Sequence, residues 1–222
     1  MTLKPPKATK GDAAHAIVKA GLSVIPMIGG PAVELFQYVM QPPLERRRGE
    51  WMQEVGERLQ ELEGTQGINL EKLGQNDEFI SAVLHATTIA MRTHKEEKRE
   101  ALRNAVMNVA VGQSPDEALE HMFFEWIDSF SVLHLQVLRA ADNPIPPQDM
   151  FMGGLIDVLE NSLPNIRQSR DVFEQIWKDL YSRSLVDIER LSGTMSGSGL
   201  AQRRTTTIGR QFLTFISEPA IY

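Results

Sequence analysis

The sequence predicts a mostly α-helical protein in two parts: a helical N-terminal domain at residues 13–130 and a C-terminal domain at residues 131–217 with a small β element. Apolar residues recur at intervals of three, four and seven over most of the chain, which is the period of amphipathic helices. A Gly/Ser-rich stretch with short β-like flanks follows Val186 and interrupts this pattern.

Composition limits the classes of protein that the chain can form. Its 222 residues suffice for one substantial domain or two small ones, and 42% hydrophobic with 23% charged residues is typical of a globular protein. The formal net charge of −6 argues against a role in coating nucleic acid. The absence of cysteine excludes disulfides, thiolate zinc sites and a cysteine nucleophile. We therefore expect a cytoplasmic protein.

Residues 1–12 contain three lysines and two prolines without periodicity, so we expect a disordered tail. The apolar segment that follows resembles a signal peptide only superficially. His15 and Lys19 interrupt it, and no small-residue cleavage site closes it.

Residues 13–41 form an apolar segment broken between Pro26 and Pro31 into two short helical pieces. Its uncharged run between Lys19 and Glu34 has 14 residues, too few to span a bilayer as one helix. Two interpretations stay open, a buried hairpin and a hairpin that inserts into a membrane or contacts a partner. Its candidate contact residues are Val24, Ile25, Ile28, Leu35 and Phe36.

Helix starts in the N-terminal domain are predicted from capping residues. Asn76 is expected to cap a helix that opens with two acidic residues. Thr93 to Glu96 and Ser114 to Glu117 both match the capping box. The charge run at residues 95–100 predicts a solvated helix face.

The C-terminal domain is predicted to begin with helices at 132–141 and 150–162, followed by a helix capped by Ser169. The last of these should pack on the other two through two apolar rows, formed by Val172, Phe173, Ile176, Trp177, Leu180 and Tyr181.

Beyond this helix, Leu185-Val186 precedes the Gly/Ser-rich stretch, and Thr206 with Gly209 opens the closing helix. With Leu180, these residues resemble the pattern of winged-helix regulators of the MarR and PadR kind over residues 131–217. The resemblance implies a recognition helix, a β-wing and DNA binding, with Arg167, Arg170, Lys178, Arg203 and Arg204 as candidate nucleic-acid or partner contacts. Residues 101–106 and 116–128 are similar to uncharacterised bacterial all-helical proteins, which implies no mechanism.

Charge on the exposed face of the predicted recognition helix argues against DNA. Asp171 and Glu174 lie there with a single base, Lys178, whereas DNA affinity comes largely from phosphate neutralisation. We therefore expect a non-enzymatic regulatory protein that binds a protein partner or associates with itself. The alternatives are a dimeric DNA-binding regulator and a membrane-active effector that uses residues 13–41.

No pattern in the sequence predicts catalysis or a cofactor. Phosphate-binding glycine loops of the Walker or dinucleotide type are absent, and the five histidines form no His-x-x-x-His pair. Ser131 and His134 lie close in sequence, but no acid follows at a diagnostic spacing. We expect no enzyme, no cofactor and no metal site.

Overall fold

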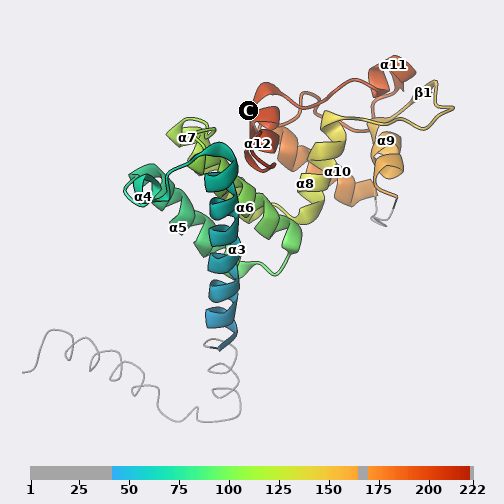
Figure 1. Ribbon diagram of the computed structural model, residues 1–222. Coiled ribbons are helices and arrows are strands. Elements are labelled where there is room, and N and C mark those ends of the chain that lie inside the picture. Colours follow the sequence, from blue (N-terminus) through green and yellow to red (C-terminus); the bar gives the residue numbers. More distant parts are fainter. Residues whose placement is uncertain (1–41, 165–169, 221–222) are drawn as a thin grey trace, which may run out of the picture. The chain divides into compact units, whose positions relative to one another are not determined.

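The computed structural model describes residues 42–164 and 170–220 (Figure 1). The predicted tail, the apolar segment at 13–41 with all five of its candidate contacts, and Arg167 lie outside the described residues. The chain divides into two compact units, Met1–Arg47 and Arg48–Tyr222, and the description below concerns the second.

The mostly α-helical prediction is confirmed. The N-terminal half of the second unit centres on α6, which contacts α5, α7 and α12 and has ten buried residues among its fifteen. This half comprises the part of α3 (Pro42–Gln66) from Arg48 onward, α4 (Leu70–Leu73), α5 (Asp77–Arg92), α6 (Glu96–Ala110) and α7 (Glu117–Ser129).

Of the three helix caps predicted in the N-terminal domain, one is confirmed and two are wrong, and the predicted cap Ser169 lies outside the described residues. The Asn76 side chain accepts a hydrogen bond from the Phe79 N–H at 3.0 Å. Helix α6 instead begins after Lys95, and the Glu96 carboxylate binds Arg103 at 2.6 Å rather than closing a capping box. Asp116 caps α7, because the Ser114 hydroxyl donates to the Glu120 carboxylate at 2.7 Å.

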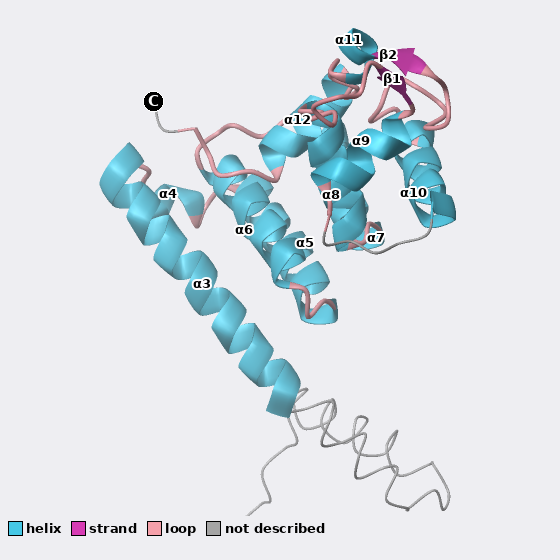
Figure 2. Cartoon of the chain, turned by 90° about the vertical axis from the view of Figure 1, so that its right-hand side faces the viewer, coloured by secondary structure: helices cyan, strands magenta, loops and turns pink. Residues whose placement is uncertain are grey.

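The C-terminal region forms a helical layer with a two-stranded antiparallel sheet (Figure 2). The predicted helix at 150–162 begins only at Leu155, because Met152 and Gly153 pair with the strand β2. The elements in order are α8 (Val132–Asp142), β1 (Met152–Gly153), α9 (Leu155–Ser162), α10 (Arg170–Ser182), β2 (Met195–Ser196), α11 (Gly197–Leu200) and α12 (Thr207–Phe215).

The Gly/Ser-rich stretch is organised differently from a simple two-stranded hairpin. Its flanks meet at one antiparallel bridge between Val186 and Thr205. Its described strand, β2, pairs with β1, which lies upstream of α9. The small sheet therefore joins two segments that are far apart in the chain.

Helix α10 packs on α8 largely as the apolar rows predict. Phe173, Ile176, Trp177 and Leu180 are buried, whereas Val172 is 37% exposed and Tyr181 is 40% exposed. These two side chains lie at the edges of the packed face, where a helix surface turns toward solvent.

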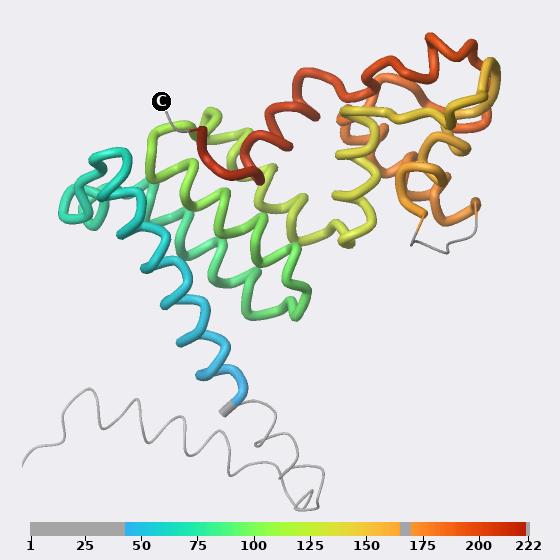
Figure 3. The backbone as a smooth tube through the Cα atoms, turned by 45° about the vertical axis from the view of Figure 1, so that its right-hand side comes forward, coloured from blue at the N-terminus to red at the C-terminus, as the bar shows by residue number. Residues whose placement is uncertain are grey.

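The two regions predicted as separate domains share one hydrophobic core. Phe123 of α7 lies 5.3 Å from Phe212 and 5.6 Å from Phe215, both on α12, measured between ring centroids. Figure 3 shows the C-terminal segment returning to α6. Within residues 42–164 and 170–220, no helix has both the length and the apolar character needed to cross a membrane.

Candidate functional site

The described arginines that the winged-helix resemblance offers as phosphate contacts lie against carboxylates. Arg170 is exposed and bonds Asp157 at 2.9 Å and Glu160 at 3.1 Å on α9. Hydrogen bonding to Glu160 and the charge of that group raise the pKa of Arg170, with a further contribution from Asp157. Its charge is thus neutralised on the protein.

Arg203 and Arg204 lie elsewhere, at the end of α8 and beside α11. Arg203 is held by Asp142 at 3.2 Å, and its side chain is 54% exposed. Arg204 is only 8% exposed, and its guanidinium donates to the carbonyl oxygen of Gly199. Of the predicted contacts among the described residues, Lys178 on α10 is exposed, Arg203 is exposed but paired with Asp142, and Arg204 is structural.

An apolar loop between α8 and α9 is the surface that the sequence analysis missed. We define it by Ile145, Phe151 and Met152, which are 57%, 84% and 70% exposed. The backbone beneath it is ordered, because the Phe151 carbonyl accepts from the Gly197 N–H at 2.7 Å and Met152 pairs with Ser196. Large apolar side chains are thus presented to solvent on a fixed backbone, a feature of interaction surfaces.

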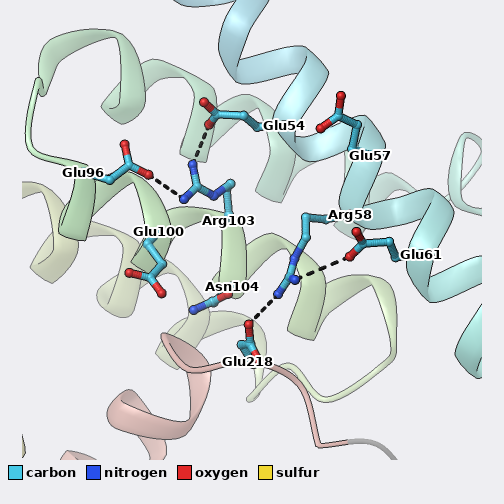
Figure 4. A pocket seen from close by; sticks show the side chains of 9 residues that line it. All are labelled: Glu54, Glu57, Arg58, Glu61, Glu96, Glu100, Arg103, Asn104 and Glu218. Atoms are coloured by element: carbon cyan, nitrogen blue, oxygen red, sulfur yellow. Dashed lines mark hydrogen bonds and ion pairs between the residues drawn. The ribbon is translucent and has the colours of Figure 1, made fainter.

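An acidic groove of about 400 Å³ lies between α3, α6 and the C-terminal segment (Figure 4). Arg103 bridges Glu54 of α3 and Glu96 of α6. Burial disfavours its charge, but hydrogen bonds to Glu96 and Glu54 outweigh this and raise the pKa of Arg103. Arg58 bonds Glu218 at 2.9 Å. These ion pairs connect α3 to α6 and to the C-terminal segment. They give the charged side chains that line the groove a structural role.

Metal binding finds no support in this groove. Among the residues that the structure describes, no three His, Asp or Glu side chains are grouped so as to hold a metal ion.

Ser131 and His134 are joined by an acid that sequence reasoning did not find. The Ser131 Oγ lies 2.8 Å from His134 Nδ1, and His134 Nε2 lies 3.4 Å from Asp179 Oδ2 on α10. The backbone N–H of Ser131 also donates to Nδ1, at 3.2 Å. Nδ1 is therefore an acceptor, and the protonated Nε2 donates a hydrogen bond to the Asp179 carboxylate. Because a side chain at the third helical position that accepts from the N-cap N–H is a capping arrangement, His134 stabilises the start of α8.

His134 predicts a pH dependence of stability. Burial lowers the pKa of His134 below its ordinary value of 6.5, although Asp179 partly opposes this. On acidification the unfolded chain therefore binds the proton first, so the free energy of unfolding should fall as pH drops below about 7. Urea unfolding across a pH series checks this in wild type and in His134→Gln, which keeps a capping side chain. The variant should show a shallower acid slope, and equal slopes would contradict the assignment.

Lys98 is the other residue whose environment the sequence did not predict. It belongs to the charge run at 95–100, which was expected to be a solvated face, yet it is only 9% exposed. The expectation was wrong for this residue, because the end of α7 covers it: Lys98 Nζ donates to the Asp128 carbonyl at 2.8 Å.

Comparisons with protein-family models, with curated proteins and with solved structures find no match for this chain.

Proposed function

We propose that this chain is a non-enzymatic regulatory protein that acts by protein–protein contact through a winged-helix-like region at residues 131–217. Support for the winged-helix-like description is the order of elements: helix, strand, helix and helix, then a bridged stretch that contains β2 and the short α11, and a closing helix. Helix α10 takes the place of the recognition helix in that order.

The observation that carries the proposal is the exposed apolar loop. Phe151 and Met152 are 84% and 70% exposed on a backbone held by β2. Burial of such side chains contributes roughly 1.5–3 kcal/mol each, and their order before binding reduces the entropic cost of association. A protein partner gains both the free energy of burial and the reduced entropic cost when it binds this loop. A second copy of this chain is one such partner.

The charges of the same region favour a protein over DNA. Arg170, Arg203 and Arg204 interact with carboxylates of the chain itself, so phosphate contacts there would have to break existing ion pairs. The exposed residues of α10 also include the acid Asp171 as well as Lys178.

Phe151→Ser with Met152→Ser should weaken association at least ~10-fold, since burial of one such side chain is already equivalent to about a factor of ten. Sedimentation velocity over a concentration series measures self-association. Photo-crosslinking from position 151 in cells that express the chain measures contact with other proteins. Leu84→Ser is the matched control, because Leu84 is 64% exposed on α5, away from the loop.

Two outcomes count against the proposal. One is a monomer at every concentration together with crosslinks at 151 no stronger than at 84. The other is salt-sensitive binding of duplex DNA that is lost in Lys178→Glu with Arg203→Glu. Arg204 is left out of that variant, because its burial would make the substitution a test of folding.

A further inference from the structure

A cleft of about 580 Å³ lies away from the apolar loop, at the start of α6 and α8 and along one edge of α10. One side is formed by the turn between α5 and α6, from Arg92 to Lys95, together with Lys98. The other side is apolar and includes Leu133, Val172 and Ile176. The cleft is therefore charged on one side and apolar on the other.

Lys98 is a buried cation in this cleft without an ion-pair partner. Its side chain donates to a backbone carbonyl, and the carboxylate of Asp128 is bound instead by Arg92 at 2.7 Å. Within the described part of the chain, no carboxylate comes into ion-pair distance of Lys98. Burial lowers the pKa of Lys98, while the charge of Asp128 partly restores it and that of Arg92 lowers it further. Two of the three ammonium donors thus stay open to a ligand.

The surroundings reinforce this positive charge. Arg92, Lys95 and Lys98 line the cleft with Asp128 as the one carboxylate among its lining residues, in a chain whose formal net charge is −6. A cleft of one sign with a low-dielectric wall concentrates ions of opposite charge. Opposite the cations, Val172 is 37% exposed although it is apolar.

We propose that this cleft binds a small amphiphilic carboxylate, whose charged head contacts Lys98 and whose apolar body lies against Val172 and Ile176. A charged head alone would leave the apolar wall in water, and an uncharged apolar molecule would leave the Lys98 ammonium unpaired in a buried site. The proposal goes beyond the contact function of the apolar loop, and neither depends on the other.

The test is isothermal titration calorimetry of the full chain with three probes. Octanoate has both features, octanol lacks the charge, and acetate lacks the apolar body. We expect octanoate to bind with a Kd below about 1 mM, and octanol and acetate to bind at least ~10-fold more weakly.

Two variants locate the binding. Lys98→Met keeps an unbranched side chain that is one atom shorter and removes the charge, so octanoate should lose its advantage over octanol. Val172→Asp places a negative charge on the apolar wall at a partly exposed position, so octanoate should bind at least ~10-fold more weakly while the fold persists. Lys178→Met is the matched control, because Lys178 is an exposed lysine of α10 that does not line this cleft, and it should bind octanoate as wild type does.

The proposal is overturned if wild type does not bind octanoate, or if acetate or octanol binds equally well. It is also overturned if Val172→Asp leaves octanoate binding unchanged, a result that does not depend on whether Lys98→Met folds.

Discussion

Replacing Gly209 with alanine is expected to destabilise the protein by about 3 kcal/mol or more. A Cβ atom at this position would lie 2.2 Å from the carbonyl oxygen of Leu185 and 3.1 Å from its carbonyl carbon. Both are backbone atoms of a fully buried residue, so no side-chain rotation can relieve the overlap. The start of α12 would have to move away from Leu185, which follows the end of α10.

That close approach is built by hydrogen bonds around Thr206, the N-cap of α12. Its hydroxyl accepts from the Gly209 N–H at 3.0 Å and donates to the Ser184 carbonyl at 2.6 Å. The Thr206 N–H donates to the Leu185 carbonyl at 3.0 Å. The threonine and the glycine of the Thr-x-x-Gly pattern thus act together. Thr206 caps the start of α12, and Gly209 leaves room for the backbone of Leu185.

Urea unfolding of Gly209→Ala measures the effect, and Gly56→Ala is the matched control. Gly56 lies inside α3 with open space where its Cβ would be, so alanine there should stabilise the protein by about 0.5–1 kcal/mol through helix propensity. An unfolding midpoint for Gly209→Ala equal to that of wild type would contradict the close approach.

Asn108→Ala is expected to cost about 2–4 kcal/mol of stability. Asn108 is fully buried, and its Nδ2 lies 2.9 Å from the carbonyl oxygen of Asn104, 3.0 Å from that of Phe215 and 2.8 Å from that of Ser217. The Phe215 carbonyl lies at the end of α12, where the last carbonyl groups of a helix have no partner within the helix. Alanine would remove this donor and leave the buried Phe215 carbonyl without it.

Asn104→Ala provides the graded comparison, because Asn104 makes one such bond, to the Ile216 carbonyl at 3.1 Å. We expect about half the loss of stability seen for Asn108→Ala. Hydrogen exchange at the amides of α12 should rise most in Asn108→Ala. Equal losses in the two variants would mean that Asn108 does not hold the end of α12 through its multiple contacts.

A predicted cap formed where no distant side chain binds the capping residue, and it failed where one does. Asn76 caps α5 as predicted, since its bond to Phe79 is local. Glu96 and Ser114 have the residue types of capping boxes, but Arg103 and Glu120 bind them instead. A capping bond contributes about 1 kcal/mol, so one competing charged contact is enough to displace it.

Prediction of the candidate sites failed for a related reason. The cleft collects residues from Arg92 to Ile176, and Lys98 is indistinguishable in sequence from its exposed neighbours in the charge run. The apolar residues around Phe151 and Met152 predict a helix, because no neighbouring residue in the sequence indicates that β2 pairs with this segment.

The sequence by itself determined the mostly α-helical class, the positions of the main helices and most of the buried face of α10, since each depends on periodicity and capping within a few turns. Only the tertiary structure decided that one core unites α7 with α12, that Lys98 is buried and that Phe151 is exposed. Those features depend on contacts between segments many residues apart, and the spacing of residues within one helix or strand does not encode such contacts.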